Sequence, residues 1–221
     1  MKLAVLISGS GSNLQALMDA CTAGSIPATV AVVISNRADA AGLERAQHAG
    51  IPTLVVDHRG FADREHFDLA LLDALAAFAP DLVILAGFMR ILTPAFIQRY
   101  RGRLLNIHPS LLPRYPGLHT HQRALDAGDD RTGATVHFVT EELDGGPPVL
   151  FASVPIAPGA TADSLAAAVQ QREHLIYPLA ARWFAEGRLV LAADGARLDG
   201  QTIPAQGIDV DTLAISEPAS S

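Results

Sequence analysis

The chain has 221 residues, one cysteine and a formal net charge of −7. This length fits one α/β domain, and the negative charge argues against a general nucleic-acid binder, which needs a basic face. Because Cys21 stands alone, an intrachain disulfide and a thiolate metal cage are excluded, and a reducing cytoplasm is expected; no apolar run reaches the roughly 18 residues of a membrane span.

The first half of the chain alternates short apolar runs with helical patterns. Strands are expected at 3–7, 29–34, 53–56, 82–86 and 104–108, and helices at 12–23, 41–49, 64–79 and 94–99. Gly50 marks the end of the second helix, Asp63 is a good N-cap for the third, and Pro80 ends it. This repeated β-α-β order predicts an open, mostly parallel twisted α/β sheet with helices on both faces, in the Rossmann-like manner.

The second half changes character after residue 108. A proline-rich loop is followed by an expected helix at 120–127, strands at 135–140 and 149–154, and a long helix at 161–185 that Pro178 should kink. These strands are expected as antiparallel additions to the sheet. Residues 1–207 form the expected domain, and the acidic segment 208–221 is expected to be a flexible tail.

A glycine loop, Ser8 to Asn13, follows the first strand and opens the first helix. Backbone amides at such a helix start point at an anion. Leu14 replaces the third glycine of the dinucleotide fingerprint, and no Gly-Lys-Ser/Thr occurs, so the loop favours a monophosphate. The alternatives are a tight turn without a ligand and, for the apolar run before it, a signal peptide; the glycine loop favours the strand.

Asn106 and His108 project from one face of the fifth strand, because side chains in a strand alternate. At the carboxyl end of a parallel strand, an amide and an imidazole can donate hydrogen bonds to a developing oxyanion. Asp144 opens an Asp-Gly-Gly-Pro turn, and a carboxylate near a histidine favours its charged, proton-donating form. The structural alternatives are a hydrogen-bonded histidine at a strand end and an ordinary Asp-Gly turn.

Other polar residues carry weaker signals. A solvated surface charge is the default for Arg64, Arg90 and Arg114, although Arg90 follows the fourth strand directly. His119 and His121 have no third ligand at a fitting spacing, so no metal is expected. Glu173 borders the buried stripe of the last long helix, and the pattern favours a position at the edge of the core.

Four blocks together resemble the glycinamide ribonucleotide transformylases, a group of 10-formyltetrahydrofolate-dependent formyltransferases. They are Gly9 to Ala16, Leu85 to Leu92, Asn106 to Pro113 and Leu143 to Pro147, in the same order over residues 1 to about 207. The Asn-x-His-Pro-Ser-Leu-Leu-Pro block is shared with other enzymes that use this folate, whereas the glycine loop with Asn13 and the segment 115–121 are more specific.

The resemblance implies transfer of the formyl group of 10-formyltetrahydrofolate to the amine of N1-(5-phospho-D-ribosyl)glycinamide, in de novo purine biosynthesis. It implies Asn106, His108 and Asp144 as catalytic residues. Substrate binding is implied for Gly11, Ser12, Asn13, Gln170 and Glu173. The folate pocket is implied for Arg64, Met89, Arg90, Ile91, Leu92, Asn106, Thr140, Glu141, Glu142, Leu143 and Asp144. No metal and no covalent intermediate is required.

Rival functions share the His108 block. A formyltetrahydrofolate hydrolase carries an added N-terminal domain, and a methionyl-tRNA formyltransferase carries an added C-terminal domain and a basic surface; neither is expected from this length and charge. A non-catalytic folate or nucleotide-binding regulator on the same fold is the third alternative. The expected partners are the two small substrates, with neither nucleic acid nor membrane, and a homodimer is compatible with the sequence.

Overall fold

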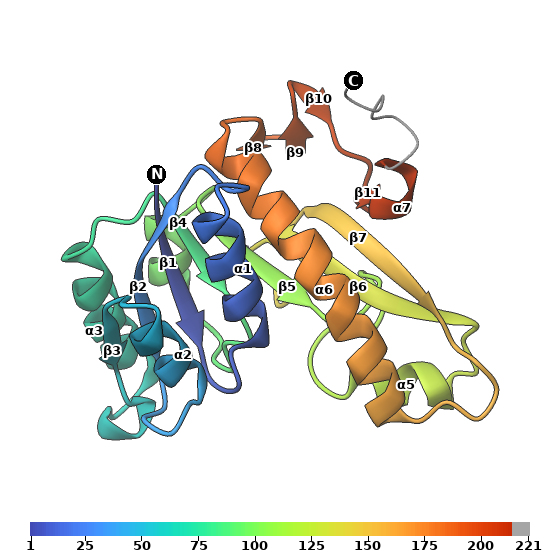
Figure 1. The fold of residues 1–221 in the computed structure, drawn as a ribbon, viewed down its shortest axis with the longest axis horizontal. Coiled ribbons are helices and arrows are strands. Elements are labelled where there is room, and N and C mark those ends of the chain that lie inside the picture. The colour runs from blue at the N-terminus through green and yellow to red at the C-terminus, as the bar shows by residue number, and fades with distance from the viewer. Residues whose placement is uncertain (214–221) are drawn as a thin grey trace.

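The fold is an open, mixed eight-stranded sheet with a small second sheet near the C-terminus (Figure 1). The computed structural model describes residues 1–213. The large sheet contains β1 (Lys2–Ile7), β2 (Thr29–Ser35), β3 (Thr53–Val55), β4 (Leu82–Leu85), β5 (Leu104–His108), β6 (Arg131–Phe138), β7 (Pro148–Pro155) and β11 (Ile208–Asp209). Their order is β11-β7-β6-β5-β4-β1-β2-β3. The strands β1 to β5 run parallel to one another, and β6 is antiparallel to both of its neighbours. The expected fold class is therefore confirmed.

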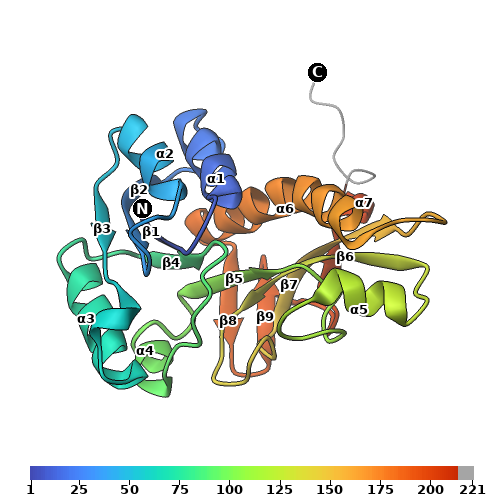
Figure 2. The same cartoon turned by 90° about the horizontal axis from the view of Figure 1, so that it is seen from below.

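Two helical layers cover the sheet, as Figure 2 shows edge-on. The helices are α1 (Ser12–Thr22), α2 (Gly42–His48), α3 (Arg64–Ala76), α4 (Pro94–Arg99), α5 (Thr120–Asp126), α6 (Ala162–Ala185) and α7 (Val210–Leu213), with a 3-10 turn η1 at His58–Gly60. Apolar side chains of α1, α2 and α6 share one buried cluster with the sheet, and those of α3 and α4 share the other. Both faces of β1, β2, β4 and β5 are therefore largely buried, which explains their unbroken apolar runs, whereas the edge strand β3 is exposed.

Local signals set the helix boundaries as expected. The Asp63 carboxylate accepts a hydrogen bond from the His66 N–H at 2.9 Å and caps α3. Gly50 has φ 70° just beyond α2, where a residue with a side chain would be strained. Helix α6 continues from Ala162 to Ala185 without a break at Pro178. No helix in residues 1–213 combines the length and apolar character that a bilayer span demands.

The structure differs from the sequence-based expectation in the C-terminal half. Strand β6 begins at Arg131 instead of at 135, because Gly133 permits close pairing with β7: a Cβ there would lie 2.1 Å from the Ala152 carbonyl oxygen. The Leu112–Pro113 peptide bond is cis.

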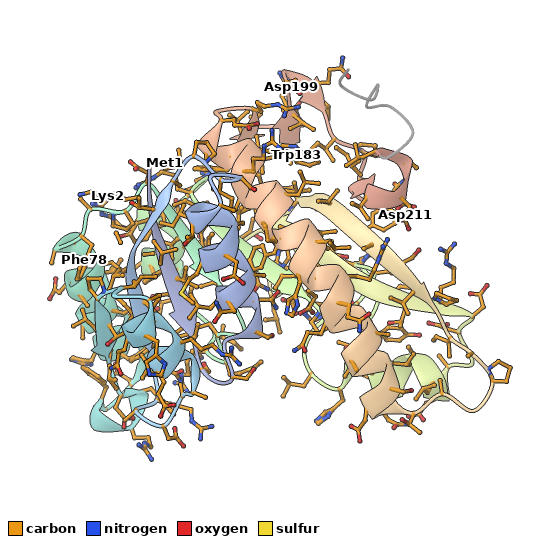
Figure 3. All side chains as sticks on the ribbon, in the orientation of Figure 1. Met1, Lys2, Phe78, Trp183, Asp199 and Asp211 are labelled. Atoms are coloured by element: carbon orange, nitrogen blue, oxygen red, sulfur yellow. The ribbon has the colours of Figure 1, made fainter. Side chains whose placement is uncertain are left out.

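The region after α6 is also more ordered than expected. β8 (Leu189–Ala192), β9 (Gly195–Leu198) and β10 (Gln201–Thr202) form an antiparallel sheet that packs near Trp183 at the end of α6 (Figure 3). Within the segment expected to be a tail, residues 208–213 contain β11, which pairs with β7, and α7, which follows it. The rest of that segment, 214–221, lies outside the described residues.

Candidate active site

The candidate site lies at the edge of the sheet where β1, β4 and β5 end. Strand order reverses between β1 and β4, since β2 and β3 extend the sheet to one side and β5 to β7 to the other (Figure 1). Open α/β sheets bind ligands in the crevice at such a reversal. The glycine loop follows β1, and the segment after Gly87 follows β4, so both face this crevice.

The glycine loop has a fixed shape because α2 supports it. Gly11 has φ 72° and stands directly before α1. Its backbone touches α2 so closely that a Cβ on Gly11 would lie 2.6 Å from the Gly42 Cα. The Gly42 N–H donates to the Gly9 carbonyl at 3.0 Å, and Arg45 Nε donates to the Ser10 carbonyl at 2.8 Å. The first amides of α1 are thereby held in place for an anion.

Helix α6 brings two more predicted residues to the start of α1. Gln170 Nε2 donates to Ser12 Oγ at 2.9 Å, and Asn13 Nδ2 donates to Glu173 Oε2 at 2.7 Å. Glu173 is only 8% exposed, and burial raises its pKa, while the hydrogen bond from Asn13 opposes that rise. Glu173 is thus a buried acid that contacts the glycine-loop end of α1.

His108, at the end of β5, and Asp144, in the turn after β6, lie side by side. His108 Nδ1 is 3.4 Å from Asp144 Oδ2, and the same oxygen accepts a hydrogen bond from the Gly117 N–H at 2.8 Å. The other ring nitrogen, Nε2, is 2.8 Å from the Tyr115 carbonyl oxygen. Because a carbonyl only accepts, Nε2 carries a proton, and a second proton on Nδ1 would make an imidazolium facing the carboxylate.

The turn that carries Asp144 is shaped by its glycines. Asp144 itself has φ 51°, in the left-handed region that aspartate tolerates better than most residues. A Cβ on Gly146 would lie 1.8 Å from the Phe138 carbonyl oxygen, so only glycine fits there. The Asp-Gly-Gly-Pro turn therefore folds back tightly on the end of β6 and turns the carboxylate toward β5.

His137 is a member of the site that the sequence did not reveal. On β6 it pairs in register with Asn106, and its Nε2 is 3.1 Å from Asn106 Nδ2 and 3.9 Å from Asp144 Oδ1. Its Nδ1 donates to the Phe138 carbonyl at 2.9 Å, so Nε2 of the neutral ring accepts from the Asn106 amide. Burial lowers the pKa of His137 to about 4. The neutral ring fixes the orientation of Asn106, and the second amide N–H of Asn106 has no hydrogen-bond partner in the part of the chain that the structure describes.

Acidification is expected to weaken the fold through His137. Its folded-state pKa of about 4 lies below the ordinary 6.5, so the unfolded chain binds the proton first and stability falls as pH drops between these values. At about 1.4 kcal/mol for each pKa unit, the full loss is on the order of 3 kcal/mol. Urea unfolding of the wild type and His137→Gln across this range should show a shallower pH dependence for the variant; parallel curves would contradict it.

A cavity of about 100 Å³ opens beside this group. Nine of the residues assigned to the folate pocket line it: Arg90, Ile91, Leu92, Asn106, Thr140, Glu141, Glu142, Leu143 and Asp144. Arg64 and Met89 do not line it, and His108 lies behind Asp144. A larger cavity of about 420 Å³ shares residues 139–142 with the first but contains none of the three predicted catalytic residues.

Several other residues singled out in the sequence lie apart from this cavity. Arg114 forms an ion pair with Asp129 at 2.7 Å. His119 stands before α5 with φ 59°, and His121 is inside that helix, where burial lowers its pKa. No cluster of three or more metal-binding side chains occurs in residues 1–213.

Replacing Glu173 by glutamine is expected to stabilise the fold. The folded-state pKa is raised, so the ionised carboxylate is favoured less in the folded chain than in the unfolded one, and this penalty grows as pH rises through the folded pKa. The glutamine carbonyl can still accept from Asn13. Chemical denaturation should therefore show a stability gain at neutral pH that vanishes in acid. An equal gain at both pH values would contradict the buried charge as the cause.

Comparison with known proteins agrees with the fold and the site. The sequence pattern of the formyl transferase family matches residues 1–181. Phosphoribosylglycinamide formyltransferase of Escherichia coli K12 is 56% identical over 211 residues, covering 96% of this chain and 100% of the relative. The Haemophilus influenzae enzyme of the same name is 53% identical, covering 93% and 97%. The structure of a phosphoribosylglycinamide formyltransferase from Coxiella burnetii superposes with a TM-score of 0.91 at 46% identity, covering 95% and 98%.

An open α/β sheet with a glycine loop before its first helix and an amide, an imidazole and a carboxylate at one edge fits a group-transfer enzyme, and the chain belongs to the formyl transferase family. Within that family its activity is phosphoribosylglycinamide formyl transfer, a step of de novo purine biosynthesis. The predicted family and activity are confirmed.

Proposed function

We propose that the cavity beside Asn106 and Asp144 binds 10-formyltetrahydrofolate, and that the glycine loop binds the phosphate of the acceptor, N1-(5-phospho-D-ribosyl)glycinamide. The family uses this folate as its formyl donor. The observation that carries the proposal is that Asn106 and Asp144 line one cavity, with His108 and His137 in contact with them. Ser12 and Asn13 would hold the phosphate through their backbone, and Gln170 and Glu173 would face the ribosyl part.

The proposed chemistry needs three groups. The acceptor amine attacks the formyl carbon, a C–N bond forms, and the carbonyl oxygen becomes an oxyanion. The free N–H of Asn106 stabilises this charge, and removing one such donor raises a barrier by roughly 2.7 to 4 kcal/mol. The C–N bond to the folate then breaks, and the folate nitrogen leaves with a proton while the amine gives one up.

Asp144 and His108 share the proton transfers. Asp144 lines the cavity; it accepts the amine proton through a water molecule and returns a proton by the same route to the folate nitrogen as the C–N bond breaks. The His108 ring faces this carboxylate through Nδ1, and its Nε2–H reaches the oxyanion when it exchanges the Tyr115 carbonyl for substrate. The predicted role of His108 as a direct donor thus requires that the loop carrying Tyr115 shifts on substrate binding.

The proposal is tested by assaying formyl transfer and folate hydrolysis side by side. With both substrates present, formylglycinamide ribonucleotide and tetrahydrofolate should form in equal amounts. Without the acceptor, formate release should be negligible. Formate release at the same rate without the acceptor would favour the hydrolase instead. A reducing cytoplasm is proposed as the setting, on the ground that Cys21 has no cysteine partner.

A further inference from the structure

One wall of the candidate folate cavity is an irregular segment. Residues 89–93 connect β4 to α4 and contain neither helix nor strand. Arg90, Ile91 and Leu92 line the cavity. Met89 is 66% exposed and Ile91 is 54% exposed, and of the residues 89–92 only Leu92, at 6% exposed, packs into the core. One buried side chain does not fix both ends of the segment, so its shape also depends on how its backbone is anchored.

The first anchor is Ser8, at the end of β1. Its Oγ accepts a hydrogen bond from the Met89 N–H at 2.8 Å and donates to Asn36 Oδ1 at 2.5 Å. Ser8 and Asn36 are 6% and 2% exposed, so water does not compete for these bonds. The single proton of the Ser8 hydroxyl is used in the hydrogen bond to Asn36. A lone pair of Ser8 Oγ therefore remains to accept the hydrogen bond from the Met89 N–H. The bond crosses the point where strand order reverses, between β1 and the chain after β4.

The second anchor is Asp68, on the inner face of α3. Its Oδ2 accepts a hydrogen bond from the Thr93 N–H at 2.6 Å, and its side chain is 2% exposed. A carboxylate buried among apolar residues is costly unless it is paired, and burial raises its pKa while the Thr93 bond opposes the rise. The other residues on this face of α3 are apolar. We therefore attribute the presence of Asp68 there to its hydrogen bond with Thr93, just before α4.

The two anchors hold opposite ends of the same wall. Between them, the N–H groups of Arg90, Ile91 and Leu92 have no hydrogen-bond partner within residues 1–213. We propose that Ser8 and Asp68 are positioning residues for the formyl donor, which fix the cavity wall 89–93 at its two ends and present its free amides to the folate. This inference rests on the proposed function, which places the folate in this cavity.

The test compares Ser8→Ala and Asp68→Ala with wild type in steady-state kinetics. Each change leaves a backbone N–H of the wall unpaired, so KM for 10-formyltetrahydrofolate should rise about tenfold, while KM for the acceptor stays within about twofold. Isothermal titration with tetrahydrofolate should show the same loss without catalysis. Asp68→Asn, whose amide oxygen can accept the Thr93 bond, should restore most of the affinity.

Ser35→Ala is the matched control. Ser35 is also a buried serine at the end of a neighbouring strand, but its hydroxyl bonds only the backbone of Arg37. Its removal should leave both KM values unchanged. If Asp68→Ala does not fold, Ser8→Ala and Asp68→Asn still decide the question, because the first should weaken folate binding and the second should not.

A further variant separates this inference from the proposed function. Leu92→Ala removes a side chain that lines the same cavity. If it leaves KM for the folate unchanged, the folate site itself is misplaced and the positioning role falls with it. If Leu92→Ala raises KM and Ser8→Ala does not, the site stands and the positioning role is wrong. Equal rises in both KM values for Ser8→Ala would also overturn it, because Ser8 would then act through the glycine loop.

Discussion

His108→Ala is expected to lower kcat by about 10² to 10³ while both KM values stay within a few-fold, the size of effect seen when an oxyanion-stabilising group is removed. The reason lies in its position. His108 contacts Asp144 at 3.4 Å but does not line the cavity, so it contributes to the transition state far more than to substrate binding. Rapid-quench or steady-state assays of formyl transfer measure the change directly.

Asp144→Asn removes the negative charge of this side chain but keeps its hydrogen bond to the Gly117 N–H. An asparagine oxygen can still accept the Gly117 N–H, but it carries no charge to pair with the His108 ring. We expect a loss in kcat similar to that of His108→Ala, and the double variant should be little worse than either, since residues that act as a unit are not additive. His48→Ala, at the exposed end of α2, is the control. Near-normal turnover in both single variants would refute the assigned roles.

The parallel half of the fold was predictable because each boundary there has a local cause. Gly9 and Gly11 interrupt the first apolar run, Asp63 caps α3, and Pro94 occupies the first turn of α4. The last strand of the large sheet has no such local cause. Ile208–Asp209 is a strand only because β7 offers it a partner far away in the chain, and two residues have no periodicity to detect.

The candidate site could be predicted from the sequence where two of its residues lie on the same strand. Asn106 and His108 share a face by strand period alone, and in the structure they contact His137 and Asp144, respectively. The contact of Glu173 with Asn13 joins residues 160 positions apart, which helical periodicity cannot show. His137 was missed because its role appears only when β6 pairs with β5 and sets it opposite Asn106. A lone imidazole in an apolar strand was the one available signal.

Gly11→Ala is expected to raise KM for the phosphorylated acceptor by about 10² or more, equivalent to roughly 3 kcal/mol of lost binding. Two effects combine. A side chain at φ 72° is strained by about 1 to 2 kcal/mol, and the new Cβ would lie 2.6 Å from the Gly42 Cα, a backbone atom that cannot swing aside. The loop must therefore move away from α2, and the amides at the start of α1 lose their alignment with the phosphate.

Two other glycines separate the clash from the strain. Gly24→Ala places alanine at φ 74° with no atom within 4 Å, so it shares the backbone strain without the collision and should leave KM unchanged. Gly42→Ala approaches the loop from α2: its Cβ would lie 2.6 Å from Ile7 Cδ1, a side-chain end that can move, and 3.1 Å from the Gly11 Cα, so it should raise KM by an intermediate factor. Calorimetric titration with the acceptor checks the order. If Gly24→Ala weakens binding as much as Gly11→Ala does, local strain explains the effect, and α2 does not hold the phosphate loop in place.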